Sequence, residues 1–167
     1  YKDHGKSYAA VYEREHAPGF RWLHESFGTN WRMLEMQAVI GRIQLQRMPN
    51  WAAKRKAYAE QIWAVCRAQT ALRVPDVPTY AQHAHYKCYV YVRPEQLKEG
   101  WSRDRIVAEI NALGVPCFQG SCSEVYLEKA FDGTGYRPEP RLPVAQELGE
   151  TSLMFLVHPT LTPAEIA

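Results

Sequence analysis

Residues 28–45 read GTNWRMLEMQAVIGRIQL, in which a glycine turn and a polar segment lead into an apolar-striped helix. Asn30 is a residue type that often caps a helix N-terminus, and Arg32 follows it closely. An amide, a guanidinium and the free backbone N–H groups at a helix start suit the binding of an anion. We therefore predict an anion site formed by Asn30 and Arg32. An ordinary cap beside a solvated arginine is the alternative.

The helical pattern that starts at residue 31 is unusually long. Apolar residues at helical spacing continue on both sides of Pro49, which should kink or restart the helix. They are Met36, Ile40, Ile43, Tyr58, Ile62, Val65 and Cys66. A helix over about residues 32–69 would be roughly 55 Å long at about 1.5 Å per residue. Because one small domain cannot cover such a helix, we expect it to bridge two domains.

Residues 73–167 predict a small α+β domain in which strands and helices alternate. In segment 86–92, cysteine and valine alternate with tyrosine, so one face of the expected strand is apolar. Ser102 should cap a helix that Gly114 ends. The other expected elements are a strand over 115–118, short helices over 126–131 and 143–148, the second closed by Gly149, a strand over 152–157 and a helix start at Thr162.

The composition is that of a water-soluble globular protein, with 46% hydrophobic and 23% charged residues. A net charge of +2 without a block of like charge argues against a nucleic-acid or membrane-surface partner, and no apolar run is long enough to span a membrane. The cysteines match no disulfide framework and no zinc spacing, so we expect reduced thiols, no metal and a cytoplasmic location. These cysteines are Cys66, Cys88, Cys117 and Cys122.

Both ends of the sequence indicate a piece of a longer protein. Thr162, Pro163 and Glu165 signal a helix start, yet the sequence ends two residues later. The first residue is Tyr1 rather than methionine. A helix start without a helix body gains no stability, and we therefore expect the natural chain to continue.

Five segments, in order, are similar to landmarks of one enzyme family. Segment 28–45 resembles the pattern GxNYRMxExQAAIGxxQL of the DegT/DnrJ/StrS family of pyridoxal-phosphate-dependent nucleotide-sugar aminotransferases. Supporting segments are His4-Gly5, 86–92, 112–116 and 156–162. The resemblance implies a fold-type I α/β enzyme. Residues 1–30 would then end the large cofactor-binding domain, 31–72 would form the long bent interdomain helix, and 73–167 the small C-terminal α+β domain, truncated at its end.

The resemblance also implies roles for two side chains. The asparagine of the family's NYR motif reaches across a homodimer interface to the cofactor phosphate of the other subunit, and Asn30 occupies that position. Arg32 would lie near the phosphates of the cofactor or of the nucleotide sugar. An amide and a guanidinium both suit phosphate oxygens. No catalytic residue is assigned, because the family's Schiff-base lysine lies upstream; Lys6 and Lys87 do not stand in its motif.

The function that the resemblance implies is transfer of an amino group, from a donor such as glutamate, to a nucleotide-linked keto sugar in lipopolysaccharide or surface-polysaccharide biosynthesis. The 167 residues alone should be inactive. A sugar dehydratase of the same fold, with histidine in place of the lysine, and a non-catalytic ligand-binding module remain alternatives. Many relatives carry VHYxPLH, in a segment that helps hold the sugar nucleotide, where this chain has 117–126, so the nucleotide and the sugar stay open.

Overall fold

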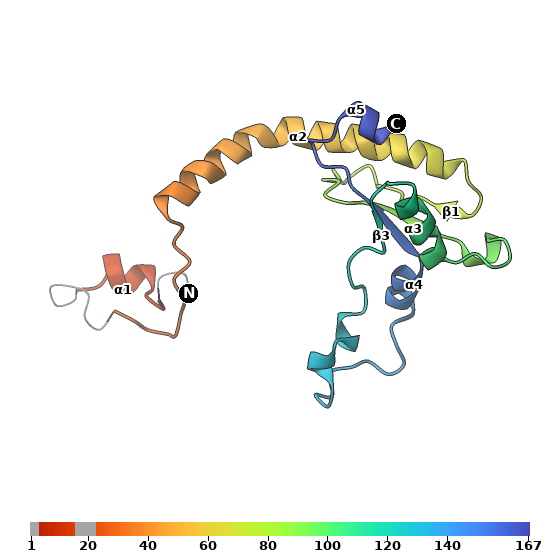
Figure 1. The fold of residues 1–167 in the computed structure, drawn as a ribbon. Coiled ribbons are helices and arrows are strands. Elements are labelled where there is room, and N and C mark those ends of the chain that lie inside the picture. The colour runs from red at the N-terminus through yellow and green to blue at the C-terminus, as the bar shows by residue number, and fades with distance from the viewer. Residues whose placement is uncertain (1–3, 16–22) are drawn as a thin grey trace. The chain divides into compact units, whose positions relative to one another are not determined.

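The computed structural model describes residues 4–15 and 23–167, which form two compact units, Tyr1–Met48 and Pro49–Ala167 (Figure 1). Segment 1–30, which is expected to end the large domain, therefore falls partly outside the described residues. Within the described part of the chain, no helix combines the length and the apolar run needed to cross a membrane. The predicted mixed α/β class is confirmed, whereas the predicted domain boundaries stay a prediction.

The first unit contains the short helix α1 (Tyr8–Tyr12), capped by Ser7, whose hydroxyl accepts a hydrogen bond from the Ala10 N–H at 3.0 Å. The backbone of residues 25–26 lies directly on Gly5, whose carbonyl accepts the N–H groups of both residues at 3.0 and 3.2 Å. Gly5 has a φ of +98°, and a Cβ there would lie 1.6 Å from the Ser26 carbonyl oxygen. Only glycine fits this close approach of two chain segments.

Helix α2 (Glu35–Arg67) has 33 residues and continues through Pro49. It begins five residues after Asn30, so the alternative interpretation of Asn30 as its cap is wrong. The Asn30 carboxamide oxygen instead accepts the Arg32 N–H at 3.2 Å, a local turn that competes with helix formation. At the helix start itself, the Leu34 N–H donates to Gln37 Oε1 at 3.0 Å.

The second unit is built on a four-stranded antiparallel sheet in the order β1-β2-β4-β3. Its strands are β1 (Leu72–Arg73), β2 (Cys88–Val92), β3 (Cys117–Phe118) and β4 (Ser152–Phe155). The register places Val90 of β2 opposite Leu153 of β4, and both are fully buried. The two longest strands thus form the centre of the sheet, and the two-residue strands form its edges.

The apolar face of β2 packs on the second half of α2. Cys88, Val90 and Val92 are buried while Tyr89 and Tyr91 are half-buried, which confirms the predicted alternation. Trp63 of α2 is 2% exposed. The other buried members of this core are Tyr58, Ala59, Cys66, Cys117, Leu153 and Val157. Burial raises the pKa of the Cys88 thiol to about 12, so this cysteine stays protonated and acts as a small apolar side chain.

Further short helices surround the sheet. Helix α3 (Arg103–Ala112) is capped by Ser102 and followed by Gly114 at φ +82°, as predicted. Helix α5 (Pro163–Ile166) begins with the predicted Thr162 signal, a capping box with Glu165. Helix α4 (Pro143–Thr151) runs past Gly149, so the expectation that Gly149 ends it is wrong. The remaining elements are the 3₁₀ helices η1 (Pro94–Gln96), η2 (Val125–Leu127) and η3 (Lys129–Phe131), of which η2 and η3 replace the helix expected over 126–131.

The side chain of Asn111, near the end of α3, pairs with strand β3. Its Nδ2 donates to the Cys117 carbonyl at 2.7 Å, and its Oδ1 accepts the Cys117 N–H at 3.3 Å. The Asn111 amide therefore satisfies both backbone groups of a residue in an edge strand, as a neighbouring strand would.

His85 is buried without a complete set of hydrogen bonds. Its side chain is packed edge-on against Trp63, with ring centroids 5.1 Å apart, and against His83 at 4.4 Å. Among the described residues, no group hydrogen-bonds to His85 Nδ1. Burial lowers the pKa of His85; the neighbouring His83 and Lys56 lower it further, while Glu60 opposes the shift. Protonation of His85 is therefore disfavoured in the folded state.

We predict that the free energy of unfolding falls as the pH drops below about 6.5, the ordinary histidine pKa, because the unfolded chain then binds a proton that the folded chain resists. Urea titrations between about pH 7.5 and about pH 5.5 measure this slope. His85→Asn should flatten it, since asparagine tolerates the positive φ of 46° and does not titrate. Equal slopes in the two proteins would contradict the assignment.

Candidate functional site

A hollow of about 470 Å³ lies between the segment that follows β3 and the end of α4. Six consecutive residues, 119–124, line one side of it, and Leu127 and Glu128 follow. Gly149 and Glu150 line the other side. Segment 119–124 lies within the stretch 117–126 that departs from the family pattern, so this hollow is the candidate site.

The start of the segment is anchored to β4 and α3. The Ser152 hydroxyl donates to the Gln119 carbonyl at 2.5 Å, and Gln119 Nε2 donates to Asp104 Oδ1 at 2.7 Å. Arg103 Nε donates to the same Asp104 oxygen at 2.6 Å. This guanidinium, and then the Gln119 amide, hold the pKa of Asp104 below its usual range, so the carboxylate stays ionised at neutral pH.

The end of the segment is fixed by the buried carboxylate of Glu124. Arg141 binds it through two nitrogens, with Nε 2.9 Å from Oε1 and Nη2 2.5 Å from Oε2. The Tyr126 hydroxyl also donates to Oε1 at 2.6 Å. These hydrogen bonds, that of Arg141 first, lower the pKa of Glu124, and the same pairing raises the pKa of Arg141. Glu124 is therefore an ionised structural group.

The middle of the segment is attached to strand β2. The Ser121 N–H donates to the Tyr89 hydroxyl oxygen at 3.0 Å, and Lys87 Nζ donates to Ser121 Oγ at 2.9 Å. Burial raises the pKa of Tyr89, but the Ser121 hydrogen bonds and the positive charge of Lys87 outweigh it, so the net shift is downward. Three separate anchors thus shape the wall of the hollow.

Gly149 leaves the space in which Ser123 sits. A Cβ at position 149 would lie 2.4 Å from Ser123 Oγ and 3.7 Å from Ser123 Cβ. The only severe conflict is therefore with the hydroxyl group. This steric demand explains a glycine inside α4, where glycine is otherwise unfavourable by about 1 kcal/mol relative to alanine.

The two residues make a double-substitution test. Gly149→Ala alone should not raise the free energy of unfolding, because the new methyl group clashes with the Ser123 hydroxyl. In the Ser123→Ala background the same change should stabilise the chain by about 0.5–1 kcal/mol through helix propensity. Urea unfolding of the four proteins measures both effects. Equal effects of Gly149→Ala in the two backgrounds would contradict the steric role.

The polar side chains that line the hollow are uncharged or anionic. Ser121 and Ser123 offer hydroxyls, Cys122 an exposed thiol, and Glu128 and Glu150 carboxylates. Such groups can hydrogen-bond to a hydroxyl-rich ligand. Within residues 4–15 and 23–167, no three His, Cys, Asp or Glu side chains are grouped so that they could hold a metal ion.

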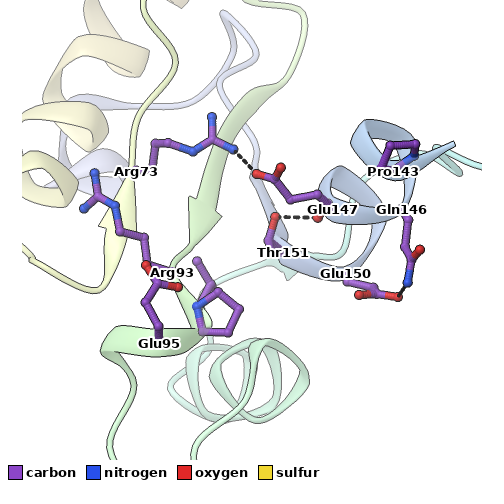
Figure 2. Close-up of a pocket in the computed structure, with 10 residues that line it drawn as sticks. Arg73, Arg93, Glu95, Pro143, Gln146, Glu147, Glu150 and Thr151 are labelled. Carbon is purple, nitrogen blue, oxygen red and sulfur yellow. Dashed lines mark hydrogen bonds and ion pairs between the residues drawn. The ribbon is translucent and has the colours of Figure 1, made fainter.

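A second hollow, of about 460 Å³, lies between β1, β2 and α4 (Figure 2). Several of its polar groups are bound by nearby groups of the protein, among them Arg93, which donates to the Leu72 carbonyl at 2.6 Å. Arg73 Nη2 lies 3.0 Å from Glu147 Oε1, and Gln146 donates to Glu150 (Figure 2). The Arg73 guanidinium also lies 4.6 Å from the centroid of the Tyr91 ring. We therefore assign no ligand to it.

The predicted site residues Asn30 and Arg32 lie in the first unit, in the turn before α2. Both are exposed. The Asn30 oxygen holds the Arg32 N–H, which fixes the backbone of the turn and leaves the carboxamide NH₂ and the guanidinium on side chains at the surface. Their chemistry fits phosphate oxygens.

A model of the DegT/DnrJ/EryC1/StrS aminotransferase family matches residues 4–167. The chain belongs to this family. The predicted resemblance is thereby confirmed. An aminotransferase from Psychrobacter cryohalolentis, whose crystal structure is known, is 68% identical, with a TM-score of 0.88 over 99% of this chain and 44% of that chain.

Two more distant matches are a curated sugar transaminase and a solved structure with the same fold. The dTDP-3-amino-3,4,6-trideoxy-alpha-D-glucose transaminase of Streptomyces venezuelae is 27% identical over 142 residues, which are 84% of this chain and 35% of that protein. A GDP-4-keto-6-deoxymannose-3-dehydratase with a trapped PLP-glutamate adduct shares the fold, at 21% identity and a TM-score of 0.66 over 84% of this chain and 36% of that one. The chain spans less than half the length of each of these three proteins.

Proposed function

We propose that this chain is the C-terminal part of a pyridoxal-phosphate-dependent aminotransferase that acts on a nucleotide-linked keto sugar in the cytoplasm, for lipopolysaccharide or surface-polysaccharide biosynthesis. The observation that carries the proposal is the family match over residues 4–167. The 68% identity to an aminotransferase supports the reaction class. The amino group would come from a donor such as glutamate.

We propose that Asn30 and Arg32 bind phosphate. Pyridoxal phosphate, when bound, supplies the electron sink for moving an amino group between donor and ketone. Asn30 would hold its phosphate in the partner subunit of a homodimer, and Arg32 would bind a phosphate of the cofactor or of the nucleotide. Exposed apolar side chains near this turn support burial against further protein: Phe27 is 100% exposed, Trp31 73% and Met36 72%.

For the substrate, we propose that the hollow at 119–124 holds part of the nucleotide sugar. Its hydroxyl and carboxylate groups can bind sugar hydroxyls and orient the ring.

The domain division proposed for the whole enzyme remains 1–30, 31–72 and 73–167. No residue of this chain is assigned a bond-making role, so the 167 residues alone should not catalyse transamination.

The full-length protein tests the reaction class. It should show the visible absorbance of protein-bound pyridoxal phosphate, lose it on addition of glutamate, and regain it on addition of a UDP- or dTDP-linked keto hexose. The isolated 167-residue chain serves as the control and should show none of these changes. A full-length protein without the absorbance would overturn the proposal.

A dehydratase is the second candidate, since the fold is shared with a sugar-nucleotide 3-dehydratase. The two enzymes give different products from a keto-sugar nucleotide and glutamate. An aminotransferase yields an amino sugar, whereas a dehydratase yields a deoxy sugar without a new nitrogen. Mass spectrometry of the product separates them, and the upstream residue that bonds to the cofactor should be lysine in the first case and histidine in the second.

Asn30→Ala in the full-length enzyme should weaken cofactor binding by about 1.5–3 kcal/mol, the value of one hydrogen bond to a charged group. The dissociation constant of pyridoxal phosphate, measured by reconstituting the apo-enzyme, should rise by about tenfold to a hundredfold. Asn50→Ala, the same substitution at an exposed position within α2, is the matched control. Equal cofactor affinity of the Asn30 variant and wild type would contradict the role.

A further inference from the structure

The wall of the hollow is built on the side of β2 that faces away from the core. Gly120 has a φ of +92°, and a Cβ there would lie 2.5 Å from Tyr89 Cε1. The backbone of the segment therefore lies directly on the tyrosine ring, in a conformation that favours glycine. Immediately after this contact, the Ser121 N–H donates to the Tyr89 hydroxyl oxygen at 3.0 Å.

The same strand also holds the Ser121 side chain. Lys87 precedes β2 and shares the face of Tyr89, because side chains two residues apart lie on one side of a strand. Lys87 Nζ donates to Ser121 Oγ at 2.9 Å, and the Tyr89 hydroxyl donates to the same oxygen at 3.3 Å. Tyr89 and Lys87 thus fix both the backbone and the hydroxyl of one residue in the wall.

These contacts hold the part of the segment that lies farthest from its other anchors. Gln119 is tied to Ser152 at the start, and Glu124 to Arg141 at the end. Ser121 and Cys122 lie between these points and are exposed. Without Tyr89 and Lys87, the middle of the wall would lose its described hydrogen bonds to the sheet.

We propose that Tyr89 and Lys87 are positioning residues that set the shape of the substrate hollow through Ser121, an inference that rests on the proposed function of the hollow. Neither residue need touch the reacting atoms. Substituting either residue should lower the affinity for the keto sugar. It should leave the first half-reaction, in which the amino donor loads the cofactor, unchanged.

The test uses the full-length holoenzyme with the UDP- or dTDP-linked keto hexoses that the wild type converts. Tyr89→Phe keeps the ring under Gly120 but removes the hydroxyl that accepts the Ser121 N–H and donates to Ser121 Oγ. The KM for the keto sugar should rise about threefold to tenfold, in keeping with the loss of the neutral hydrogen bonds that hold Ser121, while kcat changes less than about twofold. Cofactor absorbance and the rate of its loss with glutamate should match the wild type.

Lys87→Gln is the second variant, used in case the tyrosine substitution impairs folding. It should raise the KM for the keto sugar in the same way. Tyr91→Phe is the matched control, because Tyr91 lies on the same face of β2, with its ring 6.4 Å from that of Tyr89, and its hydroxyl makes no described hydrogen bond to the segment. An active wild type with unchanged KM in both variants, or an equal rise in Tyr91→Phe, overturns the positioning role alone. A wild type without cofactor absorbance or turnover overturns the proposed function, and the inference with it.

Discussion

The packing of Trp63 against the central strand holds the second unit together. The indole is 2% exposed, lies over the apolar face of β2, and donates its Nε1–H to the Tyr89 carbonyl at 3.0 Å. Burying an indole N–H without an acceptor costs free energy, and the Tyr89 carbonyl removes that cost. The indole therefore fixes both the depth of α2 on the sheet and its position along the strand.

Tyr89 connects this core to the candidate site. Its carbonyl accepts a hydrogen bond from Trp63 of α2. Its ring packs against Gly120, and its hydroxyl accepts the Ser121 N–H. One residue of the central strand thus contributes to the core through its backbone and to the hollow through its side chain.

Local patterns allowed much of the fold to be predicted from the sequence. The alternation in 88–92, the Ser102 cap and the Thr162 capping box each follow from neighbouring residues, and each is confirmed. The errors at Asn30 and Gly149 have a common cause. Asparagine can cap a helix or close a local turn, and glycine can end a helix or make room for a neighbour. Only the three-dimensional surroundings decide between these uses.

The hollow itself could not be predicted, because its walls come from distant parts of the chain. Ser121 meets Lys87 and Tyr89 more than thirty residues earlier, and Ser123 meets Gly149 across the end of α4. The departure of 117–126 from the family pattern was the signal in the sequence that pointed to this segment. The phosphate-binding roles of Asn30 and Arg32 rest on the motif and stay a prediction.

The amide of Asn111 has a consequence for how molecules of this chain meet in solution. A strand at the rim of a sheet normally presents unpaired N–H and C=O groups, which can recruit a strand from another molecule and start aggregation. At Cys117 both groups are already occupied by the Asn111 side chain, at 3.3 and 2.7 Å. One carboxamide thus blocks intermolecular strand addition at that position. Segment 119–124, which lines the hollow, follows directly after this strand.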